Sequence, residues 1–519
     1  MRSSSQDGMR SKRRYLWRAL VVAAVFAALL GKHPGASWGS SSYDPTADPY
    51  SMQSITQGDG AQAWWQAGYT GQGVDVALID TGVSPVPALS GNGKIVNGPD
   101  LSLESQNPSF RYLDTNGHGT FMAGIIGGND GQPGGYRGVA PDSRILSVKV
   151  ADADGGVDVS QVIAAIDWVV QHRHDNGMNI RVINLSYGTN SSQSFLVDPL
   201  AFAVEQAWKA GIVVVTAAGN TGLGSGLEDP AYDPWVISVG AADTMGTQSM
   251  SDDQPAAFSA GASCTGTAAM GCRAPDLLAP GAHMQGLRDP GSYVDQNNPN
   301  AALGDQYFRG SGTSEAAAYV TGAVADLLQK YPQLSPDQVK QMLVDNSDTL
   351  PGYSPLAQGA GELDLNSLLS ATPPRYLNVF HLLSWGTGSL EASRGTNHLS
   401  LGGTLLQGAQ DIFGQPFNSL KMAYLEANGS SWSGGTWNGS QWTGNSWSGN
   451  SWSGSSWSGS SWSGSSWSGS SWSGLTWSGN SWSGSSWSGS SWSGSSWSGS
   501  SWSGSSWSGD SWLGASWGR

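Results

Sequence analysis

Short apolar runs rich in valine and isoleucine recur between residues 74 and 350 and alternate with helical patterns. The runs lack the polar alternation of a half-exposed strand, which is typical of strands buried on both faces. The predicted strands are residues 74–79, 145–150, 182–185, 212–217 and 236–240, and the predicted helices are residues 159–172, 199–209 and 314–330. This alternation predicts an α/β fold with a mainly parallel sheet and helices on both faces.

Residues with catalytic chemistry follow several of these runs, where a parallel sheet places its working loops. Asp80 ends the first run, and Asn220 follows the fourth. His118 lies among small residues at the start of a helical stretch, and Ser314, which follows Gly310 and Gly312, begins the long helix. Taken singly, each residue also fits a plain role in a turn, a core or a helix cap. Together they supply a nucleophile, a base, an orienting carboxylate and an oxyanion donor.

Seven segments carry a resemblance to a known family. They are residues 77–83 (ALIDTGV), 117–120 (GHGT), 183–188 (INLSYG), 217–220 (AAGN), 237–241 (ISVGA), 278–281 (LAPG) and 312–314 (GTS). The catalytic residues also follow the order Asp, His, Ser that is known from subtilisin. Residues 55–370 therefore resemble the subtilase family of serine peptidases, and the resemblance implies a subtilisin-like three-layer fold.

The resemblance implies a role for each matching residue. Ser314 corresponds to the nucleophile, His118 to the general base, and Asp80 to the carboxylate that orients the imidazole. The Asn220 amide corresponds to the oxyanion donor. No cofactor is required for this chemistry.

The family also binds its substrates as extended peptides, by backbone pairing between two chain segments. The matching positions in this sequence are Gly155, Gly156 and Val157 on one side, and Ser186, Tyr187 and Gly188 on the other. Many relatives bind structural calcium, but the sequence shows no complete set of ligands. The three acids Asp152, Asp154 and Asp158 fit an acidic surface loop equally well.

One departure from the family lies beside the nucleophile, because Glu315 occupies a position where relatives usually have methionine. A carboxylate near His118 favours the imidazolium and would raise its pKa. We therefore expect an activity optimum at higher pH than in a Glu315→Met variant. The alternative is a glutamate that points outward and has no influence.

Charge divides the chain into three parts. Residues 1–36 have a net charge of +6, residues 428–519 are neutral, and residues 37–427 hold 16 basic and 37 acidic residues. The large middle part would repel phosphate, so the chain is not expected to bind nucleic acid. Residues 1–36 join a basic flank to a short apolar run at 19–30, which predicts a signal peptide or signal-anchor and a secreted or cell-surface protein.

Residues 37–54 form a short leader before the predicted catalytic domain at 55–370. The only cysteines are Cys264 and Cys272. In an exported protein such a pair favours a disulfide that closes a small loop, and two free buried thiols are the alternative. Their spacing does not fit a four-ligand zinc site, and no metal site is predicted.

The C-terminal part comprises a small connector module at 371–427, expected to be rich in β structure, and a low-complexity Trp/Ser/Gly tail at 428–519. The tail repeats Ser-Ser-Trp-Ser-Gly and places a tryptophan every five residues from Trp432 to Trp517. A five-residue repeat gives no stripe on a helix and no single face on a strand. It fits either a coil whose repeats stack or a flexible chain that carries exposed aromatic rings.

Together these features predict an exported serine endopeptidase that hydrolyses protein or peptide substrates. Regular tryptophans suit attachment to cell-wall material, to glycans or to other copies of the chain. The alternative is a catalytically silent surface or assembly protein on the same scaffold.

Overall fold

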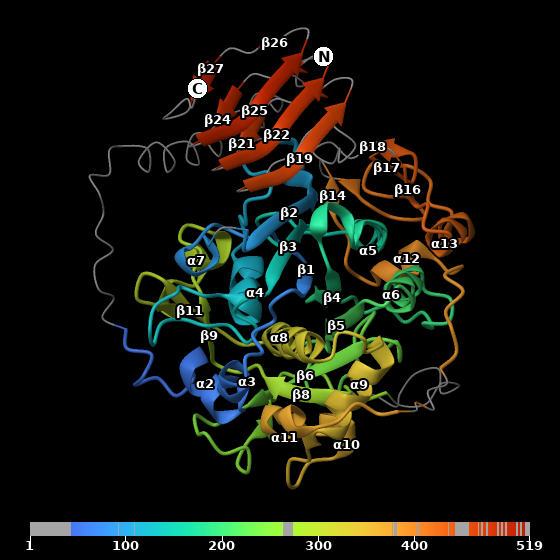
Figure 1. Ribbon diagram of the computed structural model, residues 1–519. Coiled ribbons are helices and arrows are strands. Elements are labelled where there is room, and N and C mark those ends of the chain that lie inside the picture. Colours follow the sequence, from blue (N-terminus) through green and yellow to red (C-terminus); the bar gives the residue numbers. More distant parts are fainter. Residues whose placement is uncertain are drawn as a thin grey trace, which may run out of the picture. The chain divides into compact units, whose positions relative to one another are not determined.

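The computed structural model describes residues 43–441, apart from 92, 108, 263–272, 376, 378–380, 402–403 and 434, together with the strand residues between 456 and 513. Its centre is a ten-stranded sheet with the order β12-β13-β8-β6-β5-β4-β1-β3-β2, in which β7 pairs with β6 (Figure 1). The strands are β1 Asp75–Asp80, β2 Ile95–Asp100, β3 Arg144–Lys149, β4 Ile180–Leu185, β5 Val213–Ala217, β6 Ile237–Asp243, β7 Gln254–Pro255, β8 Leu277–Pro280, β12 Ser347–Asp348 and β13 Glu362–Leu363. All pairs from β2 to β13 are parallel, and only β7 and β12 run antiparallel to their neighbours.

Helices cover both faces of this sheet (Figure 1). The helices α4 (His118–Gly127) and α8 (Thr313–Lys330) pack together on one face, and α5 (Val159–His172) and α6 (Pro199–Lys209) pack together on the other. All six residues of β1 and all five of β5 are buried, as strands covered on both sides must be. The predicted α/β fold with a mostly parallel sheet is thus confirmed.

The predicted elements agree closely with the observed ones. Helices α5 and α6 have the predicted bounds, and α8 begins one residue earlier than expected. Strand β2 was not predicted, because its sequence Ile-Val-Asn-Gly-Pro-Asp is not an apolar run. The first residues of the structured part also precede the predicted boundary at residue 55, which falls inside helix α2 (Met52–Gly58).

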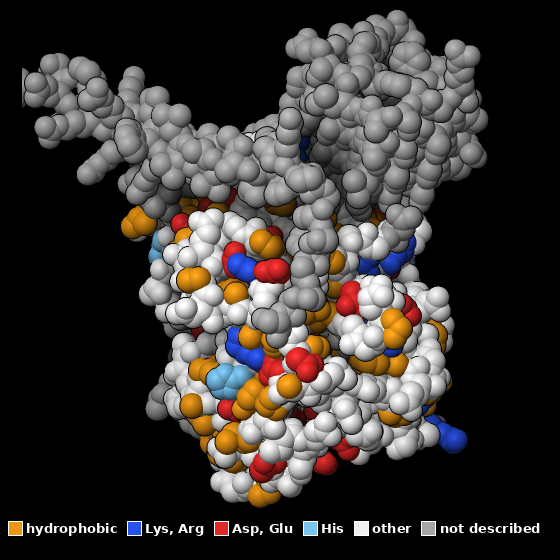
Figure 2. Space-filling view, turned by 90° about the vertical axis from the view of Figure 1, so that its left-hand side faces the viewer, with side chains coloured by type: hydrophobic (Ala, Val, Ile, Leu, Met, Phe, Trp, Pro, Cys, Tyr) orange, Lys and Arg blue, Asp and Glu red, His pale blue; other side chains and the backbone are white. Residues whose placement is uncertain are grey.

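The remaining elements of the part before residue 371 lie around the sheet. The helices are α3 Ala61–Gln66, α7 Tyr293–Asn297, α9 Pro336–Asp345, α10 Pro355–Gln358 and α11 Leu365–Ser370, with 3-10 turns η1 Pro87–Leu89, η2 Leu103–Gln106, η3 Asp175–Gly177 and η4 Pro299–Ala301. A small antiparallel sheet contains β9 (Met284–Leu287), β10 (Ala302–Leu303) and β11 (Tyr307–Gly310). The face that carries α2, α7 and β11 mixes acidic, basic and apolar side chains in small groups (Figure 2).

Residues 384–441 pack directly against α5 and α6. Up to residue 427, the regular structure of this segment consists of two helices and one strand pair. They are α12 (Leu390–Arg394), α13 (Ser419–Ala427), and β14 (Ser400–Leu401) with β15 (Thr404–Leu405). The expectation of a β-rich connector is therefore wrong for the described residues, which are mainly helical and irregular. Apolar side chains of this segment belong to the same hydrophobic core as the sheet: Leu390, Leu406, Ile412, Phe417 and Met422.

The first two tryptophans of the repeat also belong to this core. Trp432 and Trp437 are 7% and 0% exposed, in the three-stranded sheet of β16 (Trp432–Ser433), β17 (Thr436–Trp437) and β18 (Ser440–Gln441). The indole Nε1 of Trp432 donates to the Ala164 carbonyl, and that of Trp437 donates to the Asp167 carboxylate, both at 2.8 Å. The packed part of the chain thus extends past the predicted start of the tail at residue 428.

Further along the tail, the described backbone forms three parallel three-stranded sheets. Each strand pairs with the strand twenty residues further along, so that Trp457 lies in register with Trp477, and Trp477 with Trp497. The strands are β19 Ser456–Gly464, β22 Thr476–Gly484 and β25 Ser496–Gly504 in the first sheet, β20 Trp467–Ser468, β23 Trp487–Ser488 and β26 Trp507–Ser508 in the second, and β21 Ser471–Ser473, β24 Ser491–Ser493 and β27 Ser511–Leu513 in the third. Twenty residues are four pentapeptides, so this register pairs like positions of the repeat.

Two sequence expectations concern segments outside these ranges. The N-terminal segment 1–36 and the pair Cys264 and Cys272 both lie outside the described residues. Within the described part of the chain, no helix is both long and apolar enough to cross a membrane.

Candidate functional site

A carboxylate and an imidazole meet at the carboxyl end of the central strand. Asp80 is the last residue of β1 and His118 the first of α4, and His118 Nδ1 lies 2.7 Å from Asp80 Oδ1. Gly119 permits this approach, because a Cβ there would lie 2.1 Å from the Gly82 carbonyl oxygen. Asp80 is 3% exposed at its side chain and His118 is 33% exposed, so the carboxylate is buried behind the ring.

The charges around His118 favour its protonated form. Burial by itself lowers the pKa of the imidazole, but the charge and hydrogen bond of Asp80 raise it, and the Glu315 and Asp114 carboxylates add to this effect. The net result is a His118 pKa of about 9.

The nucleophile and the oxyanion donor predicted from sequence are brought together at the start of α8. Ser314 is the second residue of this helix and is 9% exposed. Asn220 Oδ1 accepts hydrogen bonds from Thr313 N at 2.8 Å and from Thr313 Oγ1 at 3.1 Å. Because a backbone N–H can only donate, these bonds fix the amide oxygen towards Thr313 and leave Nδ2 as a donor for a ligand.

A second buried carboxylate, which sequence reasoning missed, holds the loop before His118. Asp114 is 1% exposed and accepts from Gly117 N and Thr120 N, each at 2.7 Å, and from the hydroxyls of Thr81 and Thr120. These bonds tie the turn after β1 to the first turn of α4. The sequence feature that could have revealed Asp114 is an aspartate three residues before the Gly-His pair. Such an aspartate is common in turns, so it is a weak indication of this role.

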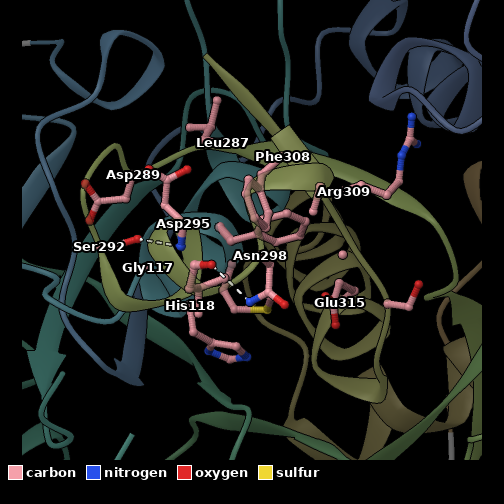
Figure 3. A pocket seen from close by; sticks show the side chains of 16 residues that line it. Gly117, His118, Leu287, Asp289, Ser292, Asp295, Asn298, Phe308, Arg309 and Glu315 are labelled. Atoms are coloured by element: carbon pink, nitrogen blue, oxygen red, sulfur yellow. Dashed lines mark hydrogen bonds between the residues drawn. The ribbon is translucent and has the colours of Figure 1, made fainter. Parts of the chain in front are cut away.

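A cavity of about 250 Å³ lies beside His118. Its walls combine apolar side chains with Asp289, Asp295 and Glu315, and His118 lies at its edge (Figure 3). Glu315 is 7% exposed, so the outward-pointing alternative is wrong. Burial raises the pKa of Glu315, while the positive charge of His118 opposes this shift.

The cations nearest this cavity are already paired. Arg309 points away from His118 (Figure 3) and forms an ion pair with Asp48, which precedes α2. Arg288 binds Asp295 with 2.6 Å between Nε and Oδ1. Within the described part of the cavity wall, Glu315 therefore faces His118 without a salt-bridge partner of its own.

The two predicted substrate-binding segments leave the sheet on either side of Asp80. Strands β3 and β4 both pair with β1, so residues 155–157 after β3 and residues 186–188 after β4 flank the carboxyl end of β1. Ser186 Oγ donates to the Ser314 carbonyl at 3.4 Å, which links the second segment to the nucleophile. Gly155 and Gly156, like Val157 and the three residues 186–188, are at least partly exposed, as a binding segment requires.

The C-terminal segment reaches both of these segments, and sequence reasoning did not foresee this contact. Asn397 Nδ2 donates to the Gly188 carbonyl at 3.4 Å, and Leu399 lies close to Gly156. Asp158 is not part of a surface loop, since it is fully buried, caps α5 and pairs with Arg394. Asp152 instead accepts from Gly156 N at 2.8 Å and stabilises the loop itself.

The described residues contain no group of three or more His, Cys, Asp or Glu side chains arranged to hold a metal ion. What the arrangement offers is the pair of His118 and Asp80, a serine in the first turn of α8 and an amide oriented towards that turn. These are the parts needed for acyl transfer through a covalent intermediate.

Comparisons with known proteins cover the part of the chain that contains this site. The family model described as the subtilase family matches residues 71–361. Serine protease AprX of Bacillus subtilis is 38% identical over 300 residues, which make up 57% of this chain and 66% of that protein. Subtilisin DY of Bacillus licheniformis is 34% identical over 307 residues, which make up 58% of this chain and 92% of that protein.

Some relatives are considerably longer than the shared region. The match to minor extracellular protease Epr of Bacillus subtilis, at 32% identity over 282 residues, covers 54% of this chain but only 36% of that protein. The C-terminal repeat lies beyond the residues that the family model covers.

Proposed function

This chain belongs to the subtilase family, and on that premise we propose that it is a serine endopeptidase that hydrolyses peptide bonds. The observation that carries the proposal is the 2.7 Å contact between His118 Nδ1 and Asp80 Oδ1. That contact fixes the ring nitrogen that faces Asp80 and leaves Nε2 for the reacting hydroxyl.

In the proposed mechanism, Ser314 Oγ attacks the carbonyl carbon of the scissile bond while His118 Nε2 takes its proton. Asp80 holds the imidazole in the required tautomer and stabilises the imidazolium that forms. His118 then donates this proton to the leaving amine, and an acyl-enzyme on Ser314 remains. Water, activated by the same imidazole, attacks the ester and releases the acid product.

The negative charge that develops on the carbonyl oxygen would be stabilised by Asn220 Nδ2 and by the backbone N–H of Ser314. Thr313 supports this role, because its two hydrogen bonds to Asn220 Oδ1 orient the amide before substrate arrives. A donor fixed in advance needs no reorganisation when the charge appears.

We also propose that the chain is exported and that its tail attaches it to a surface or matrix. The basic and apolar segments of residues 1–36 support export. The in-register pairing of strands twenty residues apart supports stacked repeats rather than a flexible tail. The attachment would be tested by comparing how the full chain and a chain ending at residue 441 partition between cells and medium.

The peptidase proposal is tested with the full chain and Ser314→Ala. Wild-type protein should hydrolyse casein and react with a fluorophosphonate probe, and Ser314→Ala should lose both properties while keeping its melting temperature. The loss of turnover should be about 10⁶-fold, the value measured for the serine of subtilisin itself. Ser354→Ala, which removes the cap of α10, is the matched control and should retain labelling.

The same experiment separates this proposal from a silent scaffold. If folded wild-type protein is neither labelled nor active, the scaffold carries some other function. If Ser314→Ala keeps near-wild-type hydrolysis, the assignment of the nucleophile is wrong.

A further inference from the structure

Glu228 lies between the predicted oxyanion residue and one of the predicted substrate-binding segments. Its backbone N–H donates to the Ala218 carbonyl at 3.1 Å, and its neighbour Asp229 exchanges two backbone hydrogen bonds with Thr189. Residue 218 is two positions before Asn220, and residue 189 directly follows the segment 186–188. The backbone around Glu228 therefore bridges these two parts of the site.

The side chain of Glu228 occupies the space that two glycines leave open. A Cβ on Gly188 would lie 2.4 Å from Glu228 Oε2, and a Cβ on Gly219 would lie 2.9 Å from Glu228 Cδ. Any larger residue at either position would displace the carboxylate. The carboxylate thus lies against the backbone of the substrate-binding segment and of the residue next to Asn220.

This carboxylate has no cation to neutralise it among the described residues. No hydrogen bond or ion pair within the described structure reaches its oxygens, and burial raises the pKa of Glu228. The neighbouring acids do not supply a counter-charge, and Asp229 is itself fully buried. A half-buried carboxylate without a partner is costly, and a cationic ligand would compensate it.

The proposed reaction places a substrate side chain at this point. Asn220 would hold the oxygen of the scissile carbonyl, and the segment 186–188 would pair with the peptide backbone before the bond. The substrate residue that contributes this carbonyl then directs its side chain between Asn220 and the segment 186–188, towards Glu228. Neither residue 188 nor residue 219 has a side chain, so the Glu228 carboxylate itself lies against the backbone at this point.

We infer that Glu228 selects substrates with a lysine or arginine immediately before the scissile bond. This inference rests on the proposed peptidase function and adds a substrate class to it. The long aliphatic stem of either residue would bring its charged end to the Glu228 carboxylate, where the two would form an ion pair. Arginine can pair in a bidentate fashion, which a lone lysine amine cannot.

The test uses the full chain and quenched fluorescent peptides that differ only in the residue before the scissile bond: arginine, lysine, leucine or glutamate. Wild-type protein should show kcat/KM values about 10- to 100-fold higher for arginine than for leucine, the range expected for a hydrogen bond to a charged group. In Glu228→Gln the ratio should fall to within about 3-fold of unity, because the side chain keeps its shape but loses its charge. Glu228→Asp should keep a preference for the cationic peptides.

Glu315→Gln is the matched control, since it removes a carboxylate that lines the cavity beside His118 and not one that lies against Gly188 and Gly219. It should leave the arginine-to-leucine ratio unchanged, whatever it does to the absolute rates, because any effect on His118 cancels in the ratio. A second readout without turnover is protection of Ser314 from a fluorophosphonate by benzamidine or by neutral benzamide. Benzamidine should protect wild-type protein more strongly, and Glu228→Gln should abolish the difference.

An unchanged arginine-to-leucine ratio in Glu228→Gln would overturn the inference, as would wild-type protein without a cationic preference. Those results leave the peptidase function intact, because the leucine peptide is still cleaved. Failure of the function is recognised differently, by wild-type protein that cleaves no peptide and reacts with no phosphonate.

Discussion

Arg394 and Asp158 form an ion pair in which both side chains are completely buried, with 2.6 Å between Nε and Oδ2. Asp158 caps α5 and directly follows the predicted substrate-binding residues 155–157, whereas Arg394 ends α12 in the C-terminal segment. Arg394 also donates to the carbonyls of Gly408 and Gln410. The pair therefore joins the C-terminal segment to the base of the substrate-binding loop.

Replacing Arg394 with methionine should destabilise the protein strongly. The substitution keeps most of the volume but leaves the Asp158 carboxylate buried without its cation, and the loss of one partner of a buried pair costs about 3–5 kcal/mol. Urea unfolding followed by tryptophan fluorescence measures this change. Because the loop at 155–157 loses its support, KM for peptides should rise more than kcat falls.

Glu391→Gln is the control for this substitution. Glu391 also pairs with Arg394, but its side chain is 37% exposed, and such a pair contributes less than about 1 kcal/mol. Equal stabilities of Arg394→Met and Glu391→Gln would show that the buried pair does not hold the segment in place.

The point at which the chain is shortened should decide whether it stays stable. A chain ending at residue 427 lacks Trp432 and Trp437, which fill the core beside α5, and loss of a buried tryptophan costs about 3–5 kcal/mol. A chain ending at residue 441 keeps both. We expect the shorter chain to melt roughly 10 °C or more below the longer one. Identical melting temperatures would mean that these tryptophans do not stabilise the fold.

The sequence was sufficient for five of the ten strands of the central sheet and for the position of the catalytic candidates, because these depend on local patterns. Asp80 comes directly after one apolar run and Asn220 three residues after another, so knowing that the strands are parallel already places them at one edge. The bounds of α5 and α6 were predictable because each begins at a capping aspartate, Asp158 and Asp198, and ends with the apolar periodicity.

Contacts between distant parts of the chain were not predictable in this way. Arg394 lies 236 residues from Asp158 and follows no motif, so nothing in its neighbourhood reveals that it is buried. Trp432 and Trp437 have the five-residue spacing of the repeat and were therefore assigned to the tail, although they pack in the core. Glu228 gave no signal either, since its significance depends on two glycines that precede it by 40 and 9 residues.

Removal of the Asn220 amide should reduce turnover without changing the fold. Asn220→Ala leaves one oxyanion donor, the Ser314 N–H, and kcat should fall by about 10²–10³, as measured for the equivalent amide in subtilisin itself. KM should change little, because the missing bond forms mainly in the transition state. Thr313→Val removes the hydroxyl that donates to Asn220 Oδ1 and accepts from Gly219 N, but it keeps the backbone bond from Thr313 N to Asn220 Oδ1. It should have a smaller effect of the same kind. A rise in KM with constant kcat would instead assign Asn220 to ground-state binding.

The pH dependence of activity should follow the charges around His118. The imidazole must be neutral to accept the Ser314 proton, so kcat/KM should rise with pH as His118 loses its own proton, with a midpoint near its pKa of about 9. Asp80, Glu315 and Asp114 all favour the imidazolium, and Asp80 has the largest effect of the three. Of these, Glu315 alone can be replaced without removing a hydrogen bond that is needed to hold the site together.

Glu315→Met removes that charge and replaces it with the residue usual in the family. The His118 pKa should fall, and the rising limb of the kcat/KM profile should move to lower pH by roughly half a unit or more. Glu315→Gln has nearly the same shape as glutamate and should shift the limb in the same direction, which separates the effect of charge from that of size. Salt offers a further check, because it screens buried charges much less than exposed ones. In 1 M NaCl, the difference between the wild-type and variant pH profiles should therefore become only slightly smaller. Superimposable profiles for all three proteins would show that Glu315 does not act on His118.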